Sequence, residues 1–341
     1  MSNTIQPILQ RLLCDTVGQE RTQALFSRVL VLPALLSATD GDVPRALLAQ
    51  AMNLVLFDDL LDRVPAGKQR VAEIAQAGGL VRFDHGALRT VVSHRSELPS
   101  GHGAFTRILE PLGFEVSDTY PLPRLRMVGR AFTHQDFPED IAQFFVSEIE
   151  LGEFSAQFRA AAERVVATSK DPLSSSAVEL LGKLARQKSL SYGEARALLP
   201  QLTACFSCQH QAPALKDYRI LLEESAEMAW ISTEGNTFNH VTERVSDVAS
   251  VAEEQHRLQR PMKAQIEVSR SGRVRQTAYF AASVERTFRL DDGTLTRMTV
   301  PGSFYEFIQR AEMTNARGEP QLDLTFDSSN AQGIFKMTAA A

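Results

Sequence analysis

The sequence has few cysteines, no long apolar run and no basic excess. Three cysteines in 341 residues cannot staple a chain of this size with disulfides, and they are typical of a reducing compartment. The longest apolar runs, such as residues 29–36, are much shorter than a bilayer span. Residues 1–13 lack the basic start and apolar core of a signal peptide. We therefore expect a cytoplasmic protein with no membrane partner.

Charge and composition narrow the class further. The 36 Lys and Arg residues are scattered among 41 Asp and Glu residues, which gives a net charge of −5. A nucleic-acid-binding protein usually carries clustered basic residues, so we expect no nucleic-acid partner. A hydrophobic content of 44% is enough to fill a core. The length suits two domains, or one pseudo-symmetric domain with insertions.

Helical and strand-like stretches alternate along the chain and predict four regions. They are an N-terminal helical region (1–79), a first β-α-β-β module (80–152), a helical insertion (153–234) and a second module with a C-terminal loop (235–341). The modules are expected to hold strands at 81–92, 124–133, 142–150, 238–245, 264–270, 274–290 and 303–311, and helices at 103–112 and 248–258. Two such modules can pair into one cupped sheet. The predicted fold class is therefore α+β, with all four regions in one compact unit.

Two histidines occur in similar settings in the two modules. His85 and His240 each lie near the start of a strand-like run that leads to an arginine, and Glu306 lies inside an apolar run. For a single histidine, a hydrogen-bonded core or surface position is the simpler interpretation, but the repeated setting favours a shared site. A buried carboxylate is costly unless it is paired, and a metal ion would pair it. Two imidazoles and one carboxylate suit a divalent transition metal and leave positions open for substrate and O2, as in non-haem Fe(II) oxygenases.

Two further residues are candidates for the same site. Arg89 follows His85 by four residues, so on a strand both side chains point to the same face. A guanidinium there can bind a substrate carboxylate through two donors. Glu148 lies in the last expected strand of the first module and is a candidate fourth ligand, or a partner of a ligand histidine. The alternative for Glu148 is a solvated strand end.

Four segments together resemble the 2-oxoadipate dioxygenase/decarboxylase family, formerly a domain of unknown function. They are residues 85–89, 235–240, 266–277 and 300–307. The resemblance covers most of the chain from residue 80 onward, and the chain is similar to a short form of the family. It implies a vicinal-oxygen-chelate fold like that of the glyoxalases, which agrees with the repeated β-α-β-β pattern.

The resemblance also implies a chemistry. Its Fe(II) would be held by His85, His240 and Glu306, with Arg89 on the substrate carboxylate; Zn, Ni or Mn could occupy the same ligands. The family converts the lysine-breakdown intermediate 2-oxoadipate and O2 to 2-hydroxyglutarate and CO2. Residues 327–335 resemble the family's terminal loop, so Ser329 and Asn330 are expected to meet the far carboxylate of the substrate.

Three classes of function stay open at this stage. The leading hypothesis is an Fe(II)-dependent dioxygenase/decarboxylase acting on a 2-oxo acid. The second is a glyoxalase-like isomerase or hydrolase that uses Zn, Ni or Mn, which a fourth protein carboxylate such as Glu148 would favour. The third is a small-molecule-binding protein without turnover. A shared fold does not decide among them.

Overall fold

The structure is a computed structural model, and it describes residues 6–315 and 317–327. The helices are α1 (Ile8–Val17), α2 (Gln19–Phe26), α3 (Pro33–Leu36), α4 (Arg45–Arg63), α5 (Pro65–Gln76), α6 (Gly103–Leu109), α7 (Ala156–Val166), α8 (Ser175–Gln187), α9 (Tyr192–Ala204), α10 (Leu215–Glu224), α11 (Ala226–Glu234) and α12 (Val248–Arg257). The strands are β1 (Val43–Pro44), β2 (Phe83–Val91), β3 (Phe114–Leu122), β4 (Met127–His134), β5 (Gln143–Ile149), β6 (Ser189–Leu190), β7 (His240–Arg244), β8 (Glu267–Val268), β9 (Val274–Ala278), β10 (Ser283–Arg289), β11 (Leu295–Pro301), β12 (Phe304–Arg310), β13 (Glu312–Thr314) and β14 (Pro320–Leu322). Within the described ranges, no helix combines the length and apolarity needed to span a bilayer.

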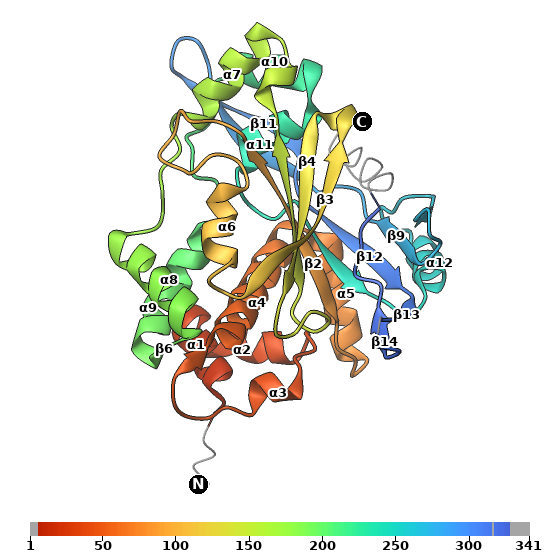
Figure 1. Cartoon of the computed structure of the whole chain (residues 1–341). Helices are drawn as coiled ribbons and strands as arrows, with labels where there is room; N and C mark the ends of the chain where they lie inside the picture. Colours follow the sequence, from red (N-terminus) through yellow and green to blue (C-terminus); the bar gives the residue numbers. More distant parts are fainter. Residues whose placement is uncertain (1–5, 316, 328–341) are drawn as a thin grey trace.

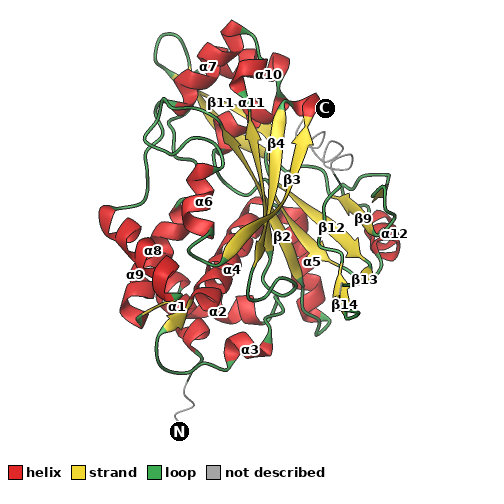
Figure 2. Cartoon of the chain, in the orientation of Figure 1, coloured by secondary structure: helices red, strands yellow, loops and turns green. Residues whose placement is uncertain are grey.

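One curled sheet of eight strands organises the molecule (Figures 1 and 2). Its strand order is β3-β4-β5-β2-β7-β12-β9-β8, and its two halves meet at the antiparallel pair β2–β7. In each half the first strand pairs in parallel with the last, β2 with β5 and β7 with β12. Each half also places a helix, α6 or α12, directly after its first strand. The predicted α+β class with two paired modules is confirmed.

The first half differs from the prediction in strand number, because it contributes four strands to the sheet rather than the expected three. The missed strand of the first half is β3, which lies at the sheet edge and is mostly exposed, so it lacks the alternation that marks a half-buried strand. In the second half the single strand expected over 274–290 is wrong. The chain leaves the sheet after β9, and β10 pairs with β11 in a separate hairpin.

Helices α4 and α5 cover one face of the sheet. The ring of Phe57 on α4 lies 6.4 Å from that of Tyr305, and Gly67 on α5 packs directly on the same tyrosine. Side chains alternate along a strand, so Glu306, the next residue of β12, points to the opposite face. The N-terminal helices therefore leave that second face to the site.

The central helical region divides into two parts. Helix α9 packs against α1 and α4, and β6 pairs with β1 beside them. Helices α7, α10 and α11 pack together elsewhere, and α11 contacts β2. Figure 1 shows these two groups near opposite ends of the molecule. One part thus extends the N-terminal helical layer, and the other packs through α11 against β2, the strand that carries His85 and Arg89.

Candidate metal centre

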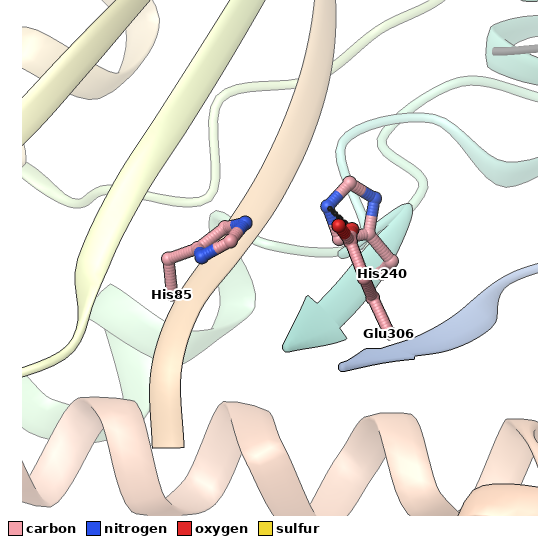
Figure 3. A group of neighbouring side chains, drawn as sticks. All are labelled: His85, His240 and Glu306. Atoms are coloured by element: carbon pink, nitrogen blue, oxygen red, sulfur yellow. Dashed lines mark ion pairs between the residues drawn. The ribbon is translucent and has the colours of Figure 1, made fainter. Parts of the chain in front are cut away.

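Three adjacent strands bring two histidines and one glutamate together. His85 lies on β2, His240 begins β7, and Glu306 lies on β12. In the register, Thr242 of β7 lies between His85 and Glu306, and His240 is two residues away on the same face. The three side chains are buried, and one ligand atom from each lies within 4.8 Å of the others. Figure 3 shows the His85 imidazole pointing toward the pair formed by His240 and Glu306.

The contacts within this group fit a divalent cation. Nε2 of His240 lies 3.1 Å from Oε2 of Glu306, and the Thr242 hydroxyl lies 3.0 Å from Nε2 of His85. Oε1 of Glu306 is buried and has no hydrogen-bond partner among the described residues. An unsatisfied buried carboxylate oxygen is costly, and a bound cation would remove that cost. Two imidazole nitrogens and a carboxylate are donors that transition metals accept.

Each histidine is oriented by the residue that precedes it. Nδ1 of His85 lies 2.8 Å from Oδ1 of Asp84, and Nδ1 of His240 lies 3.1 Å from Oδ1 of Asn239. Both oxygens accept a hydrogen bond from Nδ1–H. This arrangement fixes the tautomer that leaves Nε2 of each ring ready to bind a metal, as outer partners of ligand histidines do.

Burial sets the protonation states of the group. It raises the pKa of Glu306 to about 8, and it lowers the pKa of His85 and of His240 below the ordinary histidine value. Burial also opposes ionisation of Asp84, but Arg310 and Arg244 outweigh it and hold the pKa of that carboxyl well below its usual range. Both imidazoles are therefore neutral at pH 7. A cation that binds here would displace a proton from Glu306.

The group opens into a cavity whose empty space, together with the open solvent at its mouth, is about 460 Å³. Its walls are formed by His85, Ala87, Leu88, Arg89, Phe145, Ser147, Asn239, His240, Gln276, Glu306, Phe326 and Asp327. Arg89 is 1% exposed, and its guanidinium lies 5.1 Å from the ring of Trp230, the single tryptophan of the chain. Burial lowers the pKa of Arg89 to about 10, against the opposing charge of Glu227. The guanidinium is still charged at neutral pH, so the cavity contains a buried cation.

Glu148 does not belong to this group, and that prediction is wrong. Its neighbour in the register is Thr90, one residue after Arg89, so it points to the other face of the sheet. There its carboxylate accepts hydrogen bonds from the backbone N–H of His102 and from Arg130. Glu148 is therefore neither a ligand nor a partner of a ligand histidine.

The register identifies the true counterpart of Glu306 in the first half. His240 lies beside Phe304 of β12, and Glu306 follows two residues later. His85 lies beside Gln143 of β5, and the residue two positions later is Phe145. An apolar ring thus occupies the position where a fourth protein ligand would lie. That side of the group faces the cavity.

The structure brings His85, His240 and Glu306 together and places Arg89 in the same cavity. Ser329 and Asn330 lie outside the described residues. Sequence reasoning missed the orienting residues, although a signal was present. The triplets Phe83-Asp84-His85 and Phe238-Asn239-His240 repeat an acidic or amide residue directly before each histidine.

Fold and site together define a protein of the vicinal-oxygen-chelate type, with three donors that could hold a metal ion and an open side toward the cavity. The family model of the 2-oxoadipate dioxygenase/decarboxylases matches residues 51–337. The chain therefore belongs to that family.

Solved structures share the fold over most of the chain. A protein assigned to the glyoxalase superfamily from Ralstonia eutropha JMP134 is 48% identical, with a TM-score of 0.89 over 94% of this chain and 98% of its own. The hydroxyglutarate synthase of Oryza sativa, in complex with 2-oxoadipate, is 19% identical, with a TM-score of 0.65 over 89% and 97%. The corresponding Pseudomonas putida complex is 20% identical, with a TM-score of 0.55 over 86% and 72%. A search of curated proteins found no match.

Proposed function

We propose that this protein is an Fe(II)-dependent dioxygenase/decarboxylase that converts 2-oxoadipate and O2 to 2-hydroxyglutarate and CO2. One observation carries the proposal: a buried group of three donors, with Phe145 at the fourth position, opens into the same cavity as the buried cation Arg89. The two hydroxyglutarate synthases with 2-oxoadipate bound support the choice of substrate.

Iron held by His85, His240 and Glu306 would supply Lewis acidity and one-electron chemistry to a 2-oxo acid and O2. The protein supplies orientation and exclusion of water. We assign the carboxylate at the far end of the substrate to Arg89, whose planar pair of donors suits it. Ser329 and Asn330, which the resemblance assigns to that carboxylate, lie outside the described residues. Apolar walls, including Phe145, keep the cavity dry and strengthen that ion pair.

The reaction needs no other reactant. 2-Oxoadipate and O2 contain the same atoms and charge as 2-hydroxyglutarate and CO2, because the oxidised carboxyl carbon leaves as CO2. No external reductant and no net proton transfer are required.

The test is oxygen uptake by protein loaded anaerobically with Fe(II), with the products identified by mass spectrometry. We expect 2-oxoadipate to consume one O2 per CO2 released and to give 2-hydroxyglutarate. 2-Oxohexanoate has the same chain length without the far carboxylate and is the matched control, which we expect to react poorly. Protein with a filled iron site that consumes no O2 would contradict the proposal, and would favour a glyoxalase-like isomerase or hydrolase or a binding protein.

A further inference from the structure

Arg310 is a fully buried arginine at the end of β12, four residues after Glu306 and on the same face. Its Nε and Nη2 atoms donate to the carboxylate of Asp84, with Nη2 at 2.8 Å from Oδ1. Its Nη1 atom donates to two backbone carbonyls, those of Asp323 at 2.8 Å and Thr325 at 3.0 Å. One guanidinium thus holds the residue that orients His85 and a separate segment of the chain.

That segment, Asp323–Asp327, is called the strap here, because it crosses from the second half of the sheet to the first. At its start the Asp323 N–H donates to the carbonyl of Ala311, next to β12. Further on, the Phe326 N–H donates to the hydroxyl of Tyr120 on β3. The ring of Phe326 meets that of His85 edge-on at 4.8 Å. Phe326 and Asp327 form part of the cavity wall.

Two other arginines each bind one of the two groups that Arg310 holds together, either Asp84 or the strap. Arg244 donates to Asp84 through Nε at 2.6 Å, and no bond of its side chain to the strap is found within the described residues. Arg273 donates through Nε to the Asp323 carboxylate at 2.6 Å. Its side chain makes no contact with Asp84 among the residues that the structure describes. Arg310 differs from both because it binds Asp84 and the strap at the same time. The chain therefore contains its own matched controls.

We propose that Arg310 is a positioning residue that couples the orientation of His85 to the closure of the strap over the cavity. A metal that fixes the His85 ring also fixes Asp84, and Asp84 fixes the guanidinium whose other donor holds the strap carbonyls. Coupling of this kind is reciprocal, so a closed strap also favours the metal-binding orientation of His85. The inference rests on the metal group of the proposed function, but not on the substrate or on O2.

The experiment compares the protein with its Arg310→Gln, Arg244→Gln and Arg273→Gln variants. Co(II) affinity is measured from the visible absorption of the bound ion, and strap mobility from hydrogen exchange of the backbone amides of residues 323–327. In the unaltered protein, Co(II) is expected to slow exchange in the strap. Arg310→Gln is expected to weaken Co(II) binding by about tenfold or more, as loss of an outer partner does, and to abolish the slowing.

The Arg244 and Arg273 variants separate the effect on Co(II) affinity from the effect on strap exchange. Arg244→Gln is expected to weaken Co(II) binding while saturating Co(II) still slows strap exchange. Arg273→Gln is expected to speed strap exchange without metal, to lower Co(II) affinity only as far as it opens the strap, and to keep the slowing of strap exchange by Co(II). If Arg310→Gln does not fold, Arg310→Lys replaces it. A lysine keeps a charge for Asp84 but cannot also reach both carbonyls, so we expect nearly normal Co(II) affinity without cobalt-dependent slowing.

Two results would overturn the inference. One is a folded Arg310→Gln protein that binds Co(II) as tightly as the unaltered protein, or whose strap is still slowed by Co(II). The other is an unaltered protein that binds no Co(II), which would also remove the metal group from the proposed function. A protein that binds Co(II) and shows the coupling but consumes no O2 with Fe(II) would overturn the proposed function alone.

Discussion

At the scale of single residues, Glu306 is a ligand suited to a cation but is costly to ionise when no cation is bound. Burial raises its pKa to about 8, and one of its oxygens has no partner within the described residues, so the ionised side chain is unfavourable there without a cation. Glu306→Gln is expected to weaken Co(II) binding at least about tenfold, because a neutral amide oxygen is a poorer ligand, and to leave the metal-free protein as stable or more stable. Calorimetric titration and thermal unfolding in chelator measure the two effects.

Glu267→Gln is the matched control for that substitution, since Glu267 lies near the group but pairs with Lys263 instead. It should leave Co(II) affinity unchanged. His85→Ala and His240→Ala should each abolish Co(II) binding, because either change leaves two donors. Normal affinity after any of the three ligand substitutions would remove that residue from the metal group.

Arg89 is predicted to bind the far carboxylate of the substrate. Arg89→Lys is expected to raise the dissociation constant for 2-oxoadipate by about tenfold or more, because a compact ammonium cannot reproduce a two-donor contact with a carboxylate. The guanidinium lies over Trp230, the single tryptophan, so its fluorescence reports binding directly in anaerobic protein. Binding of 2-oxohexanoate should be equally weak in both proteins. An unchanged constant for 2-oxoadipate would reject this role.

At the scale of elements, the position of β2 depends on a glycine. Gly86 lies between His85 and Ala87, and a Cβ atom at that position would meet Cζ of Phe238 at 2.3 Å. Gly86→Ala is therefore expected to destabilise the protein by about 1–3 kcal/mol, as overpacking does. Gly193→Ala in α9 is the control, because an added methyl group there would meet no described atom within 4 Å beyond its own turn of helix, and we expect it to stabilise by about 0.5–1 kcal/mol. Urea unfolding compares the two, and equal stabilities would contradict the packing argument.

The sequence predicted elements where patterns are local and failed where register decides. The two module patterns and the repeated setting of His85 and His240 are visible along the chain. The place of Glu148 in the last strand of the first module made it a candidate ligand, but only the pairing of β5 with β2 reveals that Phe145 is the counterpart of Glu306. A shift of one residue moves a side chain to the other face of a sheet. Arg310 and Asp84 are 226 residues apart, so no local sequence pattern predicts their contact.

At the scale of the whole molecule, the two halves of the sheet share an arrangement of strands but contribute different side chains to the metal group. Each half places a histidine at the central pair of strands, but only the second half adds a carboxylate. The first half contributes an apolar ring at the equivalent position and a buried arginine beyond it. A closed set of four protein ligands is thereby replaced by three ligands and a cavity that contains Arg89. This difference favours oxygenase chemistry over a glyoxalase-like site with a fourth protein carboxylate.

The acid stability of the whole molecule is expected to depend on His134, at the end of β4. Its Nε2–H donates to the carbonyl of Leu112 at 3.0 Å, and its Nδ1 accepts from the backbone N–H groups of Asp136 and Phe137. A second proton would have to sit on Nδ1, where it would point at these two N–H groups. Burial lowers the pKa of His134 to about 4. The unfolded histidine titrates near 6.5, so the unfolded chain binds more protons between these values and stability falls as pH drops through this window, by up to roughly 3 kcal/mol.

His134→Gln separates this contribution from that of the other titrating groups. The variant is expected to be less stable than the parent at pH 7, because glutamine fits the three backbone partners less well, and to lose less stability between pH 6.5 and 4. Urea unfolding at several pH values measures both effects, with His256→Gln at an exposed position on α12 as the control for replacing a histidine by glutamine. Equal slopes in the parent and the His134→Gln protein would place the acid sensitivity elsewhere, because a group that binds no extra proton on unfolding makes no contribution to the slope.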